Sequence, residues 1–87
     1  MSTQKVTDQQ LRLIKQIDIN AVMAVELQSY LSPWTAGIFR DCLLAGHECW
    51  LLEGRFGIIG YFVLSCAGGE GHLLNLCVAP GHQGRGN

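Results

Sequence analysis

The sequence is poor in charged residues. Only 15% of its 87 residues are Asp, Glu, Lys or Arg, against about 25% in a typical soluble domain. Six basic and seven acidic residues give a net charge of −1, which argues against nucleic-acid or anionic-membrane partners, because counterion-driven binding needs clustered cations. The chain is unusually apolar for a free-standing small domain, and we expect it to be part of a larger fold.

Long apolar runs and paired cysteine motifs are absent as well. No stretch approaches the ~20 apolar residues that a bilayer core requires, and the polar segment Met1–Lys5 resembles no secretory signal. The cysteines, at Cys42, Cys49, Cys66 and Cys77, include no CxxC or other zinc-type pair. We therefore expect a cytoplasmic protein with reduced, packed thiols and no metal.

Two helices are expected in the first half of the chain. After a polar, flexible lead-in over residues 1–10, apolar residues between 19 and 31 recur on one helical stripe, with Asp18 and Asn20 as cap candidates. Pro33 ends this pattern, because the residue before a proline is kept out of the α region.

The second helix is expected from a cap at Thr35 to about residue 45. Gly46 then stands where a C-terminal glycine belongs.

The apolar pattern predicts a sheet around and after these helices. Residues 11–17 form a short first strand, and further strands are expected over 49–53, 57–66 and 72–79, separated by glycine-containing turns. We predict an α/β (α+β) fold with two helices on a mostly antiparallel sheet of three to four strands. Near-continuous apolar strands are typical of sheets covered on both faces. Two helices can shield only one face, so the fold is expected to be incomplete.

The last strand runs into a glycine-rich loop at Gln83–Asn87. Gly84 and Gly86 allow consecutive backbone N–H groups to point into one concavity, and Arg85 adds positive charge. Such a loop suits a phosphate or pyrophosphate, although a simple glycine turn has the same composition. A Walker loop is excluded, because no Gly-Lys-Ser/Thr follows, and the residues of a dinucleotide fingerprint are not there.

This segment resembles motif A of the GNAT acyltransferase superfamily, Gln/Arg-x-x-Gly-x-Gly/Ala, in all but the last position. Upstream blocks look like the bacterial ribosomal-protein-alanine N-acetyltransferases, and the resemblance covers residues 11–87 as a truncated domain that ends in the pyrophosphate loop. The blocks are Glu26–Tyr30, Ser32-Pro33-Trp34, Phe39 and His72–Pro80.

The resemblance implies acetyl transfer from acetyl-CoA to the N-terminal amine of a protein, a ribosomal-protein alanine. Main-chain groups of Leu76, Cys77 and Val78 would meet the pantetheine arm. The backbone amides that would wrap the pyrophosphate belong to Gln83, Gly84, Arg85, Gly86 and Asn87. The amine attacks the thioester directly in this family, and its glutamate base and tyrosine acid are expected after Asn87. No catalytic residue is therefore expected in this chain, and the fragment is predicted to be inactive alone.

Other side chains have both a structural and a functional interpretation. Glu26 lies on an apolar stripe, where it either reaches solvent at the stripe edge or helps to receive a cationic peptide N-terminus. Trp34 packs between the helices or lines the side from which a peptide approaches. Cys77 is favoured as a core residue over a nucleophile, and His72 and His82 as surface or hydrogen-bonding residues.

Two alternatives to protein acetylation remain. The chain is a non-catalytic module that completes its sheet with another chain, with self-association through an exposed last strand, or it belongs to a GNAT enzyme that acts on a small-molecule amine.

Overall fold

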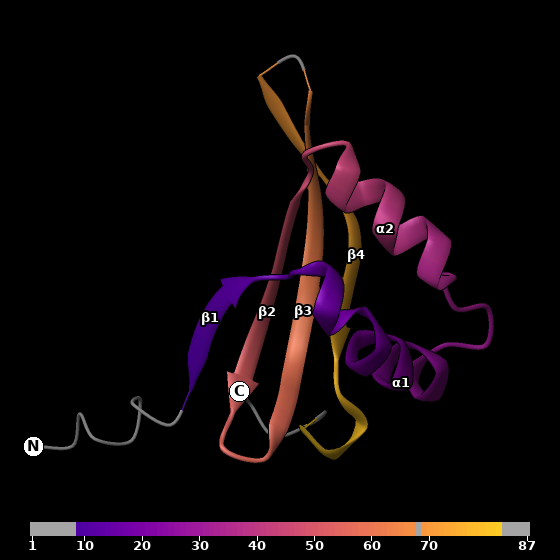
Figure 1. The fold of residues 1–87 in the computed structure, drawn as a ribbon, viewed down its shortest axis with the longest axis vertical. Helices are drawn as coiled ribbons and strands as arrows, with labels where there is room; N and C mark the ends of the chain where they lie inside the picture. The colour runs from indigo at the N-terminus through magenta and orange to yellow at the C-terminus, as the bar shows by residue number, and fades with distance from the viewer. Residues whose placement is uncertain (1–8, 68, 83–87) are drawn as a thin grey trace, which may run out of the picture.

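The computed structural model describes residues 9–67 and 69–82, and within them strands and helices follow the order β1-α1-α2-β2-β3-β4 (Figure 1). The elements span, in that order, Gln10–Leu13, Ile19–Ser29, Ala36–Leu44, Glu48–Gly54, Gly57–Ala67 and Glu70–Val78. Short 3-10 turns at Gln16–Asp18 and Pro80–His82 precede α1 and follow β4.

The four described strands form one sheet in the order β1-β2-β3-β4, and each pairing is antiparallel. Both helices lie on the same face of this sheet (Figure 1). This is the predicted α/β (α+β) arrangement of two helices on an antiparallel sheet. Of the three to four strands expected, the described sheet has four. The opposite face carries no described helix.

Most helix boundaries follow the local signals in the sequence. The Thr35 side chain accepts a hydrogen bond from the Ile38 N–H at 3.2 Å and so caps α2. Gly46 takes a φ of +79°, as a glycine beyond a helix end often does. α1 ends at Ser29, two residues before the expected end, because Tyr30 is already extended at φ −130° and ψ 146°.

The expected first strand over residues 11–17 is too long, and neither cap candidate of α1 acts as one through its side chain. β1 ends at Leu13, and Ile17 is 85% exposed in the turn before α1. Asp18 takes the N-cap position of α1, as expected, but its side chain makes no cap hydrogen bond to this helix. It accepts two hydrogen bonds from Arg12, at 2.8 and 2.9 Å, and one from the Lys15 N–H at 2.8 Å. Arg12 also donates to Glu53, so this group of charges ties β1 to β2 and to the turn before α1.

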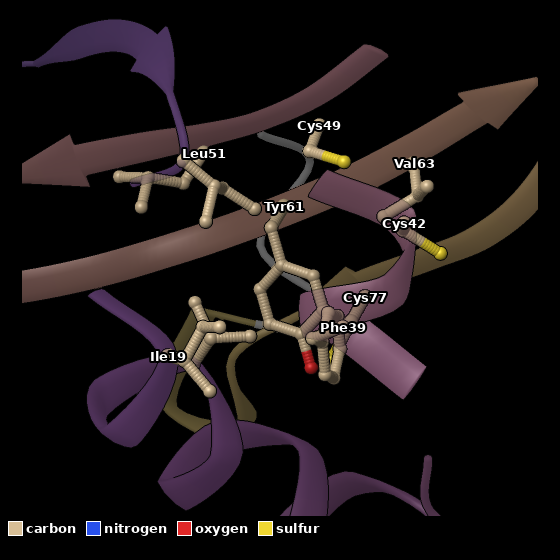
Figure 2. Close-up of a cluster of buried hydrophobic side chains, with 10 residues drawn as sticks. Ile19, Phe39, Cys42, Cys49, Leu51, Tyr61, Val63 and Cys77 are labelled. Atoms are coloured by element: carbon tan, nitrogen blue, oxygen red, sulfur yellow. The ribbon is translucent and has the colours of Figure 1, made fainter. Parts of the chain in front are cut away.

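The hydrophobic core fills the space between the sheet and the helices (Figure 2). Leu51, Tyr61 and Val63 point from the sheet toward α1 and α2 and are at most 2% exposed. Phe39 of α2 meets the Tyr61 ring edge-on, with centroids 5.9 Å apart and an interplanar angle of 80°. The remaining members of the cluster are Ile14, Ile19, Val22, Cys42, Cys49 and Cys77.

Across the sheet lies a second apolar surface, which we call the open face. Cross-strand partners share one face of a sheet, so the register groups two rows of side chains there. They are Leu13, Trp50, Phe62 and Leu76, and Leu11, Leu52, Gly60 and Val78. Leu11, Leu13 and Leu76 are 51–56% exposed, and Val78 is 39% exposed. The prediction that two helices shield only one face is therefore confirmed for the described residues.

Candidate functional site

A groove of about 320 Å³ lies between β4 and the segment that connects α1 to α2. The connecting segment contributes Tyr30, Ser32 and Trp34, α1 contributes Glu26, and β4 contributes residues 73–76. Pro33 ends the first helical pattern and Thr35 caps the next helix, so the chain between them is non-helical and lines one side of the groove. The groove thus combines a buried carboxylate with one side of a strand.

The Glu26 side chain is the buried carboxylate of this groove. It is 1% exposed, so the expectation that it reaches solvent at the stripe edge is wrong. Its Oε1 accepts hydrogen bonds from the Tyr61 hydroxyl at 2.5 Å and from Asn75 Nδ2 at 3.2 Å. Its Oε2 accepts one from the Trp34 backbone N–H at 2.9 Å. These donors compensate for its burial.

The acceptor capacity of Glu26 is only partly used by these internal donors. A carboxylate offers about four lone-pair sites, and Oε2 has a single donor among the described residues. Because Glu26 lines the groove, we predict that a further donor entering it binds this oxygen. Contact of Glu26 with a substrate ammonium group remains a prediction.

Tyr61 links the carboxylate to the aromatic core. Burial, reinforced by the hydrogen bond to Glu26, raises the pKa of the Tyr61 phenol well above its usual value. The hydroxyl is therefore protonated at any physiological pH and acts as a donor to Glu26. The ring meets Phe39, and Phe39 meets the Trp34 ring with centroids 5.0 Å apart at 63°.

The sequence left open whether Trp34 packs between the helices or lines a surface that a peptide approaches, and in the structure it packs between the helices and lines the groove. Its ring is half-buried and packs against Phe39 between the helices, and the residue also lines the groove. Its backbone N–H holds the connecting segment to Glu26. Contact of Trp34 with a peptide stays a prediction.

The hydrogen-bond pattern of β4 determines which main-chain groups face the groove side. The Ala79 N–H donates to the Ile59 carbonyl oxygen of β3 at 2.8 Å. Hydrogen-bonded and non-bonded pairs alternate in an antiparallel ladder, so Cys77 is also bonded to β3 in this register. The N–H and C=O groups of Leu76 and Val78 point away from β3, toward the edge of the described sheet.

This direction separates the three residues predicted to meet the pantetheine arm. Leu76 and Val78 present main-chain groups at the edge, whereas those of Cys77 face β3 and its side chain is 3% exposed in the core.

The register of β3 and β4 also skips Leu74, which makes β4 one residue longer than β3 at this point. This bulge lies in the wall of the groove, where β-bulges often re-aim side chains.

Other predicted residues lie elsewhere or outside the description. The Cys77 side chain is buried in the core, as is typical of a structural cysteine. His72 is exposed near Glu70, with Nε2 and Oε1 3.5 Å apart. The predicted pyrophosphate loop, residues 83–87, and the His82 side chain lie outside the described residues.

Sequence reasoning missed Asn75, Tyr61 and Tyr30. Asn75 is 8% exposed in the otherwise apolar second half of β4, and a buried polar side chain needs a partner. Its position in the run Leu73–Val78 was the available signal. The Tyr30 hydroxyl donates to the Leu76 carbonyl oxygen and lies 3.4 Å from Asn75 Oδ1.

Neither metal-binding groups nor membrane-spanning helices occur in the described part of the chain. No three His, Cys, Asp or Glu side chains there gather to hold a metal ion. No helix there is both long and apolar enough to cross a membrane.

Comparison with known proteins relates the chain to one fold. No protein-family model and no curated protein matches the sequence. Among solved structures, it is similar to the ribosomal-protein-S18-alanine N-acetyltransferase from Escherichia coli, with a TM-score of 0.81 and 18% sequence identity. The match covers 90% of this chain and 50% of that chain. The chain has a GNAT-type fold, as the sequence resemblance implies, and spans half the length of that enzyme.

Proposed function

We propose that the chain provides the acetyl-CoA-binding part of an N-α-acetyltransferase whose acceptor is the N-terminal amine of a protein. A ribosomal-protein alanine is the first acceptor to consider. The observation that carries the proposal is the groove itself, in which β4, the last strand of the described sheet, lies beside the buried Glu26 carboxylate in a GNAT-type fold.

The carrier would lie along the edge of β4. The outward main-chain N–H of Leu76 suits a carbonyl group of a pantetheine arm, and Val78 lies further along the same edge. β4 ends at Val78 and is followed by a short turn, Pro80–His82, that leads directly to residues 83–87. Backbone amides of that glycine-rich segment and the Arg85 guanidinium would hold the pyrophosphate.

The acceptor would approach through the groove. An ammonium group that donates to Glu26 Oε2 is attracted by the carboxylate, and Trp34 provides an apolar wall beside it. After loss of a proton, the amine nitrogen bonds to the thioester carbonyl carbon, the carbon–sulfur bond breaks, and coenzyme A leaves as the thiol. Cys77 takes no part, because its side chain is in the core.

We further propose that turnover needs residues outside these 87, including the base and the acid, and that the protein is cytoplasmic. Thiol release by this chain alone, with acetyl-CoA and an alanine-starting peptide, is expected to be absent. Turnover at an ordinary enzymatic rate of about 1 per second or faster would overturn this part of the proposal.

Carrier binding is tested by NMR titration of the isotopically labelled chain with acetyl-CoA. The expected shifts concentrate at the backbone amides of Leu76, Val78 and residues 83–87. Shifts confined to the open face, or no shifts at millimolar acetyl-CoA, would contradict the proposal.

The acceptor class is tested with a matched pair of peptides. A peptide that starts with alanine is expected to perturb the signals of Glu26 and Trp34, whereas the same peptide with an acetylated N-terminus is not. Equal effects of both peptides would exclude recognition of the amine. Perturbation by a small polyamine such as spermidine, with none by the peptide, would favour a small-molecule acceptor instead.

A non-catalytic assembly module is the second candidate, and the open face favours it. Its side chains at Leu11, Leu13 and Leu76 are more than half exposed, and exposed apolar patches mark interaction surfaces. Sedimentation over a range of concentrations separates the candidates. A stable monomer that binds acetyl-CoA would exclude the assembly module, and an oligomer without acetyl-CoA affinity would support it.

A further inference from the structure

One hydrogen bond ties the end of α1 to the edge of β4. The Tyr30 hydroxyl, at the end of α1, donates to the carbonyl oxygen of Leu76. That carbonyl points away from β3, as the bonded pair Ala79–Ile59 and the register require. Tyr30 therefore covers an acceptor that belongs to the free edge of the described sheet.

An added strand needs both groups of such an edge residue. Strand addition uses the outward C=O as an acceptor and the outward N–H of the same residue as a donor. At Leu76 the carbonyl oxygen already accepts a hydrogen bond from the Tyr30 hydroxyl. The Leu76 N–H points to the same edge, and Tyr30 does not bind it. Proteins commonly protect exposed edges from unwanted strand pairing, because a free edge is a template for aggregation.

We propose that Tyr30 determines what the β4 edge can bind: it closes the edge to an added peptide strand and leaves the Leu76 N–H for a ligand carbonyl oxygen. The closure to strands holds whatever the ligand is. Identification of the ligand carbonyl with that of an acyl thioester or pantetheine amide rests on the proposed function.

The surroundings of Tyr30 keep its hydroxyl in this role. Tyr30 directly follows α1, and its own N–H donates to the Glu26 carbonyl oxygen at 3.2 Å. The Glu26 side chain binds Asn75 of β4, next to Leu76, so the helix end and the strand are fixed to each other. Burial is the main cause that raises the pKa of the Tyr30 phenol, so the hydroxyl keeps its proton at neutral pH.

Tyr30→Phe removes the hydroxyl and keeps the ring. The expected result is that the variant self-associates at a concentration about fivefold or more below that of the unchanged chain, because each freed acceptor adds one interchain hydrogen bond. Sedimentation velocity over a concentration series measures this difference, with the chain itself as the probe strand. Identical association curves for the two proteins would overturn the proposal.

A second variant shows whether the added association uses this edge. Leu76→Pro removes the outward N–H, and a proline is tolerated where an edge N–H does not bond within the sheet. In combination with Tyr30→Phe it is expected to return association to the level of the unchanged chain, whereas Tyr30→Phe with Leu76→Ala, which shortens the same open-face side chain and keeps the N–H, is not. Association of the double variant with Leu76→Pro as strong as that of Tyr30→Phe would overturn the assignment to β4. Urea unfolding of each variant confirms that the compared proteins are folded.

Acetyl-CoA is the probe for the donor. In the unchanged chain, acetyl-CoA is expected to shift the Leu76 amide signal. Binding of acetyl-CoA without any shift at Leu76 would overturn the donor role while the carrier proposal stands. Absence of acetyl-CoA binding would contradict the proposed function, and the sedimentation results would still decide whether Tyr30 closes the edge.

Discussion

Under α1 and α2 the sheet presents Leu51, Tyr61 and Val63, which are at most 2% exposed, whereas on the open face Leu13 and Leu76 are 51% and 56% exposed. The same strands build both surfaces with similar apolar side chains. The covering helices make the difference, since only the closed face excludes water. An apolar strand pattern therefore identifies a sheet with two apolar faces, but not which face is covered.

The two faces also differ in their polar chemistry. The closed face contains the Glu26 carboxylate with the Tyr61 hydroxyl and Asn75 amide as donors, while the two rows of the open face consist of apolar side chains and Gly60. Hydrogen bonds are stronger where water is excluded. We therefore expect substitutions on the closed face to have large effects and those on the open face to have small ones.

Removal of the buried carboxylate gives the largest expected effect. Glu26→Ala leaves the donors of Tyr61, Asn75 and Trp34 without their acceptor, and we expect a loss of about 3–5 kcal/mol in the free energy of unfolding. Urea denaturation measures it. The matched control is Glu70→Ala, at a carboxylate whose side chain is 76% exposed, where a change within about 0.5 kcal/mol is expected. Similar losses of stability for the two variants would contradict the expected difference between a buried and an exposed carboxylate.

Truncation of one leucine on each face gives the next largest difference. Leu51 is fully buried, so Leu51→Ala is expected to cost about 2–5 kcal/mol, from lost burial and the cavity left behind. Leu76→Ala is expected to cost less than about 1 kcal/mol, because that side chain is 56% exposed. Equal costs in urea denaturation would mean that the open face is covered in solution, for example by another copy of the chain.

Tyr61→Phe tests a single hydrogen bond within the Glu26 network. The ring can keep its contact with Phe39, while Glu26 loses the donor at 2.5 Å. We expect a loss of about 1–2 kcal/mol, since the carboxylate keeps two other donors. A loss as large as that of Glu26→Ala would show that the hydroxyl, rather than the whole network, supports the carboxylate.

The smallest expected effect concerns the partly buried charges at β1. Hydrogen bonds from Arg12 hold the pKa of Asp18 below its usual value, and they act on Glu53 in the same direction. A depressed pKa means that this stability is present above the unfolded-state pKa of about 4 and is lost as the pH falls through the folded-state value.

Arg12→Gln is therefore expected to flatten the decline of stability between about pH 5 and pH 2. Urea midpoints measured across this range test the expectation, and added salt should reduce the difference between the two proteins. An equally steep decline without Arg12 would assign the acid sensitivity to other carboxylates.

Local signals predicted much of the fold. Pro33, the Thr35 cap and Gly46 act within one or two turns of chain, and the structure places the helix boundaries near them. The same holds for the alternation of strands and glycine turns after residue 48. β1 is shorter than expected, and no local signal indicated that Arg12 within it would bind Glu53, 41 residues away in the chain.

The candidate site depended on contacts that the sequence does not reveal. Glu26 could be singled out by its place on an apolar stripe, but its donors Tyr61 and Asn75 lie 35 and 49 residues away in the chain. The bulge at Leu74 belongs to the pairing of β3 with β4, and the direction of the Leu76 main-chain groups follows from that register. A one-residue shift in register would exchange the two faces of a strand.

The two tryptophans allow the most direct test that the groove, and not the open face, receives the acceptor. Trp34 lines the groove, and Trp50 lies in a row of the open face. A tryptophan-free peptide that starts with alanine is titrated into Trp50→Phe, which keeps Trp34, and into Trp34→Phe, which keeps Trp50, with fluorescence as the readout. A saturable change in Trp34 emission with none in Trp50 is the predicted result. A change in Trp50 alone, or in neither residue, would contradict the assignment of the groove as the acceptor site.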